Sequence, residues 1–429
     1  MDRLFKLQER GTTVQREVVA GLTTFLTMAY ILAVNPGMLG AAGMSAGGVF
    51  TATALASAIA TLVMAFTANL PVALAPGMGL NAFFAYTVVV GMGYSWQLAL
   101  TAVFLEGILF IILSLVNVRE LIIKAIPANL KKAVAVGIGL FITLIGFANS
   151  GIVVNNTGTI VGLGSLSSGG APLLAIIGLV ITIVLYANRI PGSILIGIIV
   201  TAIIGIPMGV TAVPDGFSLV SLPAAPLFAQ FDFSKIATFE FFTVFFTFLF
   251  VDIFDTVGTL VGVSAQAGLT DKNGEIPRVK QALLSDAVGT VAGALLGTST
   301  VTSYVESTAG VAVGGRTGLA SVITGILFVA ALFLSPLFLL IPGAATAPAL
   351  VVVGFLMMQS VTGIDFRDPT EGIPAFLIIV MMPFAYSIAD GIVYGLLSYV
   401  ILKGLTMKFK DIPVVTWVLF VVFILRFFI

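Results

Sequence analysis

The chain has 429 residues, of which 59% are hydrophobic and only 9% are charged, and its net charge is zero. Ordinary soluble domains carry about 25% charged residues, which excludes a soluble protein, and the apolar runs are continuous rather than alternating, which excludes an outer-membrane barrel. The absence of Cys and His excludes disulfides, thiol catalysis and imidazole proton relays, and the zero net charge gives no indication of a nucleic-acid partner.

Apolar segments of membrane-spanning length recur along the whole chain. Because about 20 apolar helical residues cross a bilayer, the pattern predicts an all-α polytopic membrane protein with fourteen spans. A further apolar stretch, 412–428, contains Arg426 and predicts a peripheral helix at the membrane interface. The predicted spans are 18–38, 48–67, 72–91, 98–116, 128–149, 171–188, 191–209, 238–264, 281–297, 299–315, 317–341, 345–361, 373–389 and 391–407.

The third span begins with residues that break helices. Its sequence is NLPVALAPGMGLNAFFAY (69–86), and its first half carries two prolines together with Gly77 and Gly79. These residues oppose a helix, whereas NAFFAY can start one, with Asn81 near its N-terminus. The span is therefore predicted to be extended first and helical afterwards.

The following spans carry acidic residues at membrane depth, where a carboxylate is costly and is a functional candidate. We expect Glu106, in the fourth span, to hydrogen-bond to a hydroxyl or to an amide of a broken span. Asp252 and Asp255 are three residues apart in the eighth span, so they share one helix face. Asp286 begins the ninth span beside Lys280 and is interpreted mainly as structural.

The tenth span is the second broken one. Its sequence, LGTSTVTSYVESTAGVAVGG (296–315), starts with β-branched and hydroxyl residues that favour a strand, and a helix is expected to resume near Ser307, just after Glu306. The two broken spans occupy corresponding places in the two halves, and their extended pieces can pair as a short antiparallel ladder. Such a pair indicates a transporter binding site; re-entrant loops of purely structural use are the alternative.

The positive charges sort the loops into two sets. With fourteen spans, every Lys and Arg except Lys235 and Arg426 lies in one set of loops, which the positive-inside rule makes cytoplasmic. Both termini are therefore expected in the cytoplasm and the uncharged loop 150–170 outside. The acid-bearing spans contain no Lys or Arg, so their carboxylates are expected to hold protons.

The chain also repeats itself weakly. The run KAVAVGIGLFITLIGF (132–147) is echoed by APALVVVGFLMMQSV (347–361), and residues 16–32 run parallel to 240–255. The matches keep their order, which suggests two units of seven spans; an odd number places the units in opposite orientations, as in secondary transporters. Chance similarity among apolar helices is the alternative.

Three segments resemble a known family. APGMGLNAFFAY (75–86), FVDIFDTVGTLVGV (250–263) and TSTVTSYVESTAGVAVGGRTGL (298–319) are similar to the signature segments of AzgA-like purine permeases. These form a branch of the nucleobase–cation symporters related to the uracil transporter UraA. The likeness begins near residue 15 and covers nearly the whole chain.

The resemblance implies proton-coupled uptake of hypoxanthine, guanine or adenine across the cytoplasmic membrane, with the proton as coupling ion and no other cofactor or metal. It implies a seven-plus-seven inverted repeat, and related gate domains form dimers, so a homodimer is a further expectation. The implied domains are the core (1–116 and 236–342), the gate (117–235 and 343–410) and a C-terminal interfacial helix (411–429).

The resemblance also implies the site residues. The substrate-binding residues that it carries over by motif are Gly79, Asn81, Asp252, Asp255 and Glu306, and the three acids also handle the proton. A purine is flat and edged with N–H donors, so carboxylates can accept from it. The aromatic residues beside the broken spans are candidates for stacking on the ring, foremost Tyr304, with Phe83, Phe84 and Phe254.

Three other functions compete with this interpretation. An anion transporter of the sulfate or bicarbonate type shares the fold and would use the two helix N-termini, but three acids at one point oppose it. An intramembrane aspartyl protease needs YD and GxGD motifs, whereas this chain has FVDIF and SIADG, so no enzyme is expected. A passive channel is the third alternative, and uptake with and without an uncoupler separates it from a symporter.

Overall fold

The computed structural model describes residues 2–115, 127–166, 170–270 and 276–425. In this part, nine helices are long and apolar enough to cross a membrane, and four shorter apolar helices accompany them. With the broken segment that ends in α13 (Ser307–Ala312), they account for the fourteen predicted spans, so the predicted fold class is confirmed. The predicted cytoplasmic charges Arg119, Lys124 and Lys272, and Arg426 of the tail, lie outside the described residues.

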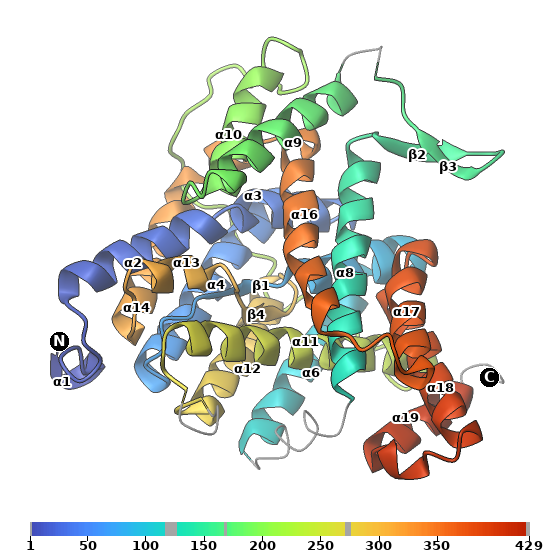
Figure 1. Ribbon diagram of the computed structural model, residues 1–429. Coiled ribbons are helices and arrows are strands. Elements are labelled where there is room, and N and C mark those ends of the chain that lie inside the picture. The colour runs from blue at the N-terminus through green and yellow to red at the C-terminus, as the bar shows by residue number, and fades with distance from the viewer. Residues whose placement is uncertain (1, 116–126, 167–169, 271–275, 426–429) are drawn as a thin grey trace.

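One group of helices packs around α4, which contacts α3, α12 and α14, while α2 packs on α13 and α14 (Figure 1). We call this group the core bundle. Besides α13, its members are α2 (Val14–Met28), α3 (Ile31–Ala41), α4 (Ala46–Thr67), α5 (Met78–Ala82) with the π-helix η1 (Phe83–Gly91), α6 (Trp96–Leu115), α11 (Phe239–Gln266), α12 (Val279–Leu296), α14 (Gly318–Ala331), η2 (Leu332–Leu334) and α15 (Ser335–Leu339).

A second group packs around α8, which contacts α16, α17 and α18, while α9 and α10 pack on α16. We call this group the gate bundle; the domain boundaries implied by the resemblance stay a prediction. Its members are α8 (Ala128–Asn149), α9 (Ala171–Ala187), α10 (Ser193–Gly205), α16 (Gly343–Met358), η3 (Gln359–Gly363), α17 (Pro369–Phe384), α18 (Ile388–Leu405), η4 (Phe409–Asp411) and α19 (Val414–Leu425).

The two helices that echo each other in sequence, α8 and α16, pack face to face in the gate bundle. Glycines allow this close approach: a Cβ on Gly139 would lie 2.7 Å from the carbonyl oxygen of Gly354, and one on Gly354 would lie 2.5 Å from that of Gly139. Small residues at such contacts let helix backbones approach in a membrane, where dispersion rather than water drives packing.

The two broken spans meet as predicted. Strand β1 (Leu74–Pro76) pairs antiparallel with β4 (Val301–Ser303), Ala75 lying opposite Thr302, and both strands are buried. The helix after β4 begins at Ser307, where it was expected, whereas the helix after β1 begins at Met78, three residues before Asn81. Gly77 rather than Asn81 therefore stands at that helix start.

Two threonines satisfy the strand backbones on the sides that the ladder leaves open. Thr61 of α4 accepts from Leu74 N and donates to its carbonyl oxygen, at 3.0 and 3.2 Å. Thr290 of α12 makes the same pair of bonds with Val301, at 3.2 and 3.1 Å. Buried backbone polar groups need partners, and the equivalent arrangement in both halves agrees with the predicted inverted repeat.

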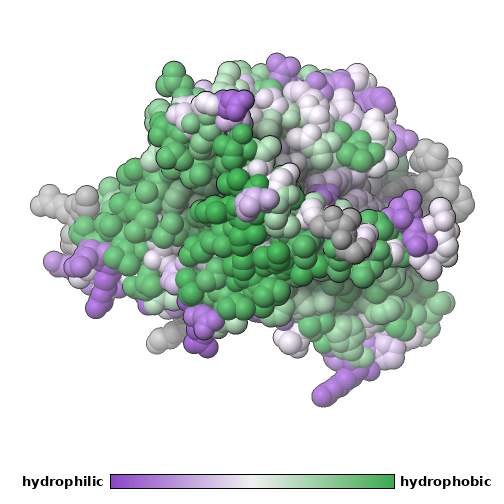
Figure 2. All heavy atoms as spheres, turned by 90° about the horizontal axis from the view of Figure 1, so that it is seen from above, coloured by the Kyte–Doolittle hydropathy of each residue, from purple (hydrophilic) through white to green (hydrophobic). Residues whose placement is uncertain are grey.

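The loop expected outside the membrane contains a hairpin that the sequence did not predict. Strands β2 (Val153–Asn156) and β3 (Ile160–Leu163) pair antiparallel and project from the end of α8 (Figure 1). Elsewhere the surface is broadly apolar: Figure 2 shows continuous hydrophobic areas with hydrophilic residues near the edges. Hydrophobic areas of this extent need a lipid environment.

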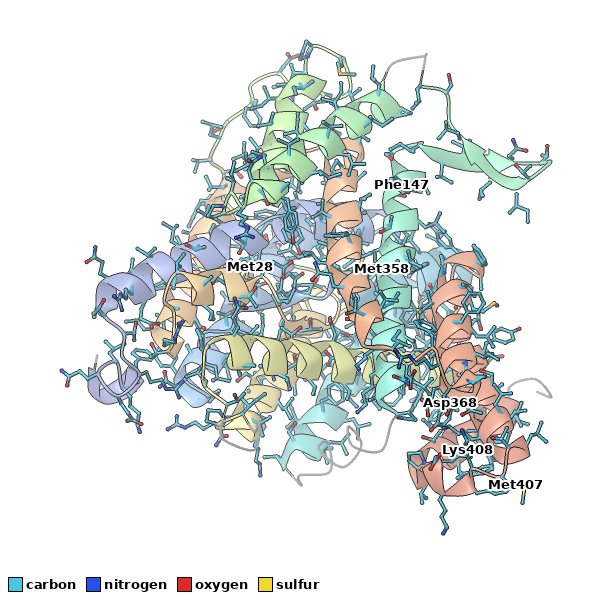
Figure 3. All side chains as sticks on the ribbon, viewed as in Figure 1. Met28, Phe147, Met358, Asp368, Met407 and Lys408 are labelled. Carbon is cyan, nitrogen blue, oxygen red and sulfur yellow. The ribbon has the colours of Figure 1, made fainter. Side chains whose placement is uncertain are left out.

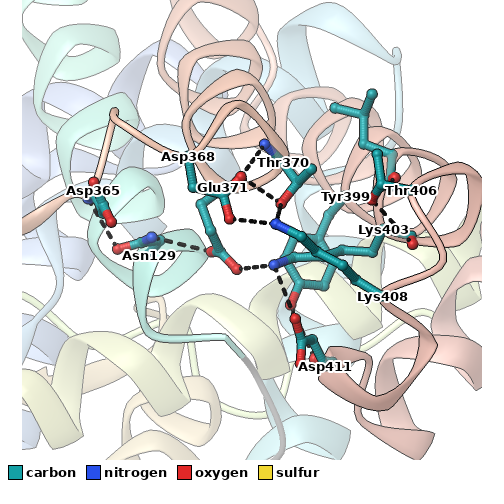
Figure 4. A network of polar contacts seen from close by, with 11 residues as sticks. Asn129, Asp365, Asp368, Thr370, Glu371, Tyr399, Lys403, Thr406, Lys408 and Asp411 are labelled. Atoms are coloured by element: carbon teal, nitrogen blue, oxygen red, sulfur yellow. Dashed lines mark hydrogen bonds and ion pairs between the residues drawn. The ribbon is translucent and has the colours of Figure 1, made fainter.

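Charged residues at the end of the gate bundle form a network (Figure 4). Lys403 of α18, only 3% exposed, lies 2.8 Å from Glu371 of α17 and 3.5 Å from Asp411. Glu371 also accepts from Asn129 at the start of α8, at 3.0 Å. Asp368 pairs with Lys408 at 2.8 Å (Figure 3). These contacts join α8, α17, α18 and the chain leading into α19.

Candidate functional site

A cavity of about 510 Å³ lies between the core bundle and the gate bundle. Its core side is formed by α2, α11 and the start of α13, and its gate side by α8, α9, α10, α16 and η3. Cavities of roughly 300–1,000 Å³ bury small ligands, so this one is large enough for a substrate. The polar residues of its core wall are Thr27, Asp255, Thr259, Glu306 and Thr308.

Glu306 stands at the junction between β4 and α13. The hydroxyl group of Tyr30, which is fully buried, donates a hydrogen bond to Glu306 Oε1. Thr27 donates to the Glu306 carbonyl oxygen at 3.4 Å. The strand-to-helix junction therefore points this carboxyl group at the cavity, and the segment between α2 and α3 holds it in place. Tyr30 was not among the predicted site residues, because it lies outside the broken spans.

Asp255 reaches the same cavity from α11 and accepts from the Thr302 hydroxyl of β4 at 3.2 Å. One strand thus positions both acids, since Glu306 follows β4 in the chain. Within the described part, neither acid has an ion pair: their hydrogen-bond partners are neutral hydroxyl groups. Such a carboxyl group can gain or lose a proton without separating from a fixed cation.

Asp252 lies one turn earlier on α11 and is fully buried behind the cavity. The Thr256 hydroxyl lies 3.3 Å from Asp252 Oδ1 and 2.6 Å from Asp286 Oδ1. Asp286 is therefore a fully buried neighbour of Asp252 inside α12 and not an edge residue beside Lys280, as the sequence suggested. Its position seven residues after the start of α12 indicates a residue inside the helix. Sequence spacing alone does not show which neighbouring helix its side chain faces.

Glu106 fulfils its structural expectation. It is fully buried in α6 and accepts from the Thr300 hydroxyl at 2.8 Å, just before β4. Glu106 and Asp255, one from α6 and one from α11, therefore both accept hydrogen bonds from threonine side chains of the second broken span.

The remaining predicted site residues lie behind the cavity surface. Asn81, fully buried, accepts from the Ser299 hydroxyl and donates to the Pro76 carbonyl oxygen at 3.3 Å, and Tyr304 donates to the same oxygen at 2.6 Å. A Cβ on Gly79 would lie 2.5 Å from Ile138 Cγ2 of the cavity wall. In this conformation they fasten the two broken spans together and to α8.

The aromatic candidates are also buried. Phe83 and Phe84 pack their rings against Phe248, with centroids 4.9 and 6.4 Å apart, while the side chain of Phe254 lies outside the described part. The aromatic residue that does line the cavity is Tyr186 of α9, which the sequence did not suggest. No pattern in the α9 sequence distinguishes it from a packing residue.

Comparison with known proteins adds the family. The sequence matches the Permease family (Xan_ur_permease) over residues 15–394. The chain belongs to this permease family. The resemblance drawn from the three motifs is thereby confirmed, and with it the expectation of a multi-pass transporter rather than an enzyme.

Two relatives and one solved structure are similar to this permease. The guanine/hypoxanthine permease PbuG of Bacillus subtilis is 47% identical, with 100% of this chain and 99% of that protein covered. The adenine permease AdeQ of Escherichia coli is 45% identical, with 99% and 96% covered. The transmembrane domain of the cyanobacterial bicarbonate transporter BicA superposes with a TM-score of 0.65 at 15% identity, covering 89% of this chain and 97% of that domain; this likeness shows the fold alone.

Proposed function

We propose that this permease imports purine nucleobases across the cytoplasmic membrane by proton symport. The names of the relatives PbuG and AdeQ support guanine, hypoxanthine and adenine as the substrate class. The observation that carries the proposal is the pair of acids in the cavity, Asp255 and Glu306, with hydroxyl partners and no ion pair in the described part.

The geometry suggests how the coupling works. An ionised carboxylate accepts hydrogen bonds from the N–H edge of a purine, and Tyr30 occupies one oxygen of Glu306, which leaves the other for the base. A protonated Glu306 carries no charge, so the core bundle with base and proton bound can pass the apolar gate bundle without moving a net charge through it. Asp255 and Asp252 then serve as neighbouring proton acceptors on α11.

We also propose that both termini are cytoplasmic and that the hairpin β2–β3 is outside, because of the Lys and Arg distribution. The chain has no Cys, so single cysteines report sidedness directly. A cysteine at Ile160, which is 82% exposed, should react with an impermeant thiol reagent added to intact cells. A cysteine at the exposed Lys410 should react only after the cells are opened; the reverse result contradicts the orientation.

Uptake by purified protein in proteoliposomes tests the transport proposal. With an inward proton gradient, radiolabelled guanine, hypoxanthine or adenine should accumulate, and a protonophore should reduce the inside-to-outside ratio to one. Accumulation that persists with the protonophore contradicts symport. Transport of bicarbonate or sulfate in place of all three bases would support the anion transporter that the fold also allows. The gate-mediated homodimer stays a prediction, which the mass of the purified protein in detergent decides.

A further inference from the structure

The gate wall of the cavity contains the start of a helix. α10 begins at Ser193, and both Gly192 and Ser193 line the cavity. The turn before α10 lies close to the core bundle, since a Cβ on Gly192 would be 3.3 Å from the carbonyl oxygen of Leu26 in α2. Thr27, the next residue, lines the same cavity and donates to the Glu306 carbonyl oxygen. The start of α10 therefore lies beside the segment that holds Glu306.

Several polar groups at this helix start have no partner within the described residues. Ser193 is only 7% exposed, yet its hydroxyl group makes no hydrogen bond there, and no side chain caps the helix. The backbone amides of Ile194 and Leu195, two buried residues, have no acceptor in the same part of the chain, whereas the amide of Ile196 donates to Gly192. Buried polar groups without partners are costly in a membrane, so the cavity has to supply their partners.

These groups are hydrogen-bond donors. A backbone amide can only donate, and a serine hydroxyl group can donate as well as accept. The first turn of α10, a helix of 13 residues, also carries partial positive charge from the helix dipole. On the core wall, the carboxylates of Asp255 and Glu306 are acceptors. The two walls of the cavity therefore have complementary chemistry, with acceptors on the core side and donors on the gate side.

The gate wall also contains an aromatic ring close to this helix start. Tyr186 lies in the last turn of α9, just before the turn that leads to Ser193, and it lines the cavity. Its ring makes a T-shaped contact with Phe355 of α16, with centroids 6.3 Å apart. Among the described residues that line the cavity, no other is aromatic. Because aromatic rings stack on nucleobases, Tyr186 can cover the face of a flat ligand whose edges reach both walls.

We propose that the start of α10 is a recognition subsite for the oxygen on carbon 6 of a purine, with Tyr186 stacked on the ring and a ring N–H at Asp255 or Glu306. Guanine and hypoxanthine carry this carbonyl oxygen next to a ring N–H, so they satisfy both walls at once. Adenine carries an amino group in that position, which faces the donors of α10 and leaves them without an acceptor. Polar sites reject ligands of this kind. The proposal rests on the proposed function and narrows its substrate class to 6-oxopurines.

Binding to the purified full-length permease tests this inference, with the change in thermal unfolding on adding ligand as the readout. The probes are guanine, hypoxanthine, adenine and 6-thioguanine, which keeps the ring N–H of guanine but replaces the oxygen with sulfur, a weak acceptor. We expect guanine and hypoxanthine to bind about tenfold more tightly than adenine, and guanine more tightly than 6-thioguanine. Adenine that binds as tightly as the two 6-oxopurines would overturn the inference.

The substitution Ser193→Ala removes the hydroxyl group from this subsite. It should weaken the binding of guanine by about fivefold, the effect of one hydrogen bond, and the binding of 6-thioguanine much less. The matched control is Ser398→Ala in α18, which removes a partly buried serine that bonds to Gly395 away from the cavity and should change neither affinity. If Ser193 is merely structural, Ser193→Ala weakens all four ligands equally, and the inference is wrong.

The ring of Tyr186 has its own pair of variants. Tyr186→Phe keeps the ring and should keep the affinity for every base. Tyr186→Leu should weaken all of them by about tenfold, the effect of losing one stacked aromatic side chain, and should leave the ratio between guanine and adenine unchanged. A Tyr186→Leu variant that binds as tightly as Tyr186→Phe would contradict the stacking.

Failure of this inference can be told apart from failure of the proposed function. If purine bases accumulate in proteoliposomes but Ser193→Ala leaves the preference for guanine over 6-thioguanine unchanged, the inference is wrong and the proposed function stands. If no base binds or moves, while bicarbonate or sulfate binds and Ser193→Ala weakens that binding, the proposed function fails. The start of α10 is then an anion site, and the purine subsite is wrong as well.

Discussion

Glu306 and Glu371 are both glutamates beside a helix start, but their partners differ. Glu306, in the core bundle, accepts from the neutral hydroxyl of Tyr30 and faces the cavity. Glu371, in the gate bundle, lies 2.8 Å from the ammonium group of the buried Lys403 and accepts from Asn129. The same contrast separates Asp255, bonded to Thr302, from Asp368, bonded to Lys408.

This difference separates two uses of acids in one fold. A carboxylate held by a buried lysine is costly to neutralise, because removing its charge leaves the cation uncompensated; it suits a permanent structural contact. A carboxyl group held by hydroxyls keeps its hydrogen bonds in either protonation state, because a hydroxyl both donates and accepts. Under the proposed function, the core acids exchange protons and the gate acids hold their bundle rigid.

We expect the largest effect from substituting a core acid, and this effect is on transport. Glu306→Gln keeps the shape of the side chain but cannot exchange a proton, so we expect loss of base accumulation against a gradient and binding weakened by about 2–5 kcal/mol. Uptake driven by an imposed pH gradient measures it. Glu240→Gln, at the exposed start of α11, is the matched control. Normal accumulation by Glu306→Gln would falsify its coupling role.

The second-largest effect is expected from substituting a gate acid, and this effect is on the stability of the fold. Glu371→Gln leaves the buried Lys403 with the more distant Asp411, and we expect the free energy of unfolding to fall by about 3 kcal/mol, since breaking a buried ion pair is strongly destabilising. Accumulation per folded molecule should persist.

Glu371→Leu combined with Lys403→Met should recover part of the loss, because two apolar side chains leave no buried charge. Thermal unfolding in detergent measures both variants. If Glu371→Gln abolishes accumulation while keeping its Tm, the proposed division between core and gate acids is wrong.

The third effect is at the boundary between the two bundles. Gly79→Ala places a Cβ 2.5 Å from Ile138 Cγ2 of α8, and overpacking of this kind costs about 1–3 kcal/mol. We therefore expect slower counterflow of the base, because the added methyl group disturbs the contact between the two bundles. Ile138→Ala removes the opposing methyl group, so the double variant should regain the rate; a double variant as slow as Gly79→Ala would show that the clash is not the cause.

The smallest effect concerns pH. The Lys408 ammonium group, with the Thr370 hydroxyl and amide, holds the pKa of Asp368 below its ordinary value. A depressed folded-state pKa gives stability that is present above the ordinary aspartate value and is lost as the pH falls through the folded one.

Asp368→Asn should therefore lower the Tm at neutral pH by about 1 °C, and the difference from the parent should shrink only in strongly acidic buffer. Melting curves across the acidic range measure this. A difference that vanishes already near neutral pH contradicts the assignment to Asp368.

The sequence predicted the broken spans well because their signals are local. Prolines and glycines oppose a helix before Asn81, and β-branched residues favour a strand before Glu306, so the ladder and the start of α13 at Ser307 followed. The predicted contact of Glu106 with a hydroxyl was also confirmed, since a buried acid needs a donor and this region is rich in threonine.

The missed features depend on which helices face each other. The sequence indicates an edge position for Asp286, whereas the structure places it near Asp252, a contact that depends on how α11 and α12 pack. Tyr30 lies between α2 and α3, and Tyr186 lies in α9, outside the broken spans. Hydrophobic periodicity predicts which residues share a face of a helix, but it does not predict which other helix packs against that face.

The ladder between β1 and β4 has a consequence for how the chain is made. Tyr304 and Pro76, bonded at its end, are 228 residues apart. At a synthesis rate of about 5–20 residues per second, the first broken span waits on the order of 10 to 50 s in the membrane before its partner emerges. During that time Thr61 can satisfy only one residue of the strand. Insertion of the first half therefore produces an incomplete unit, whose exposed backbone depends on lipid headgroups, water or the insertion machinery until the second half arrives.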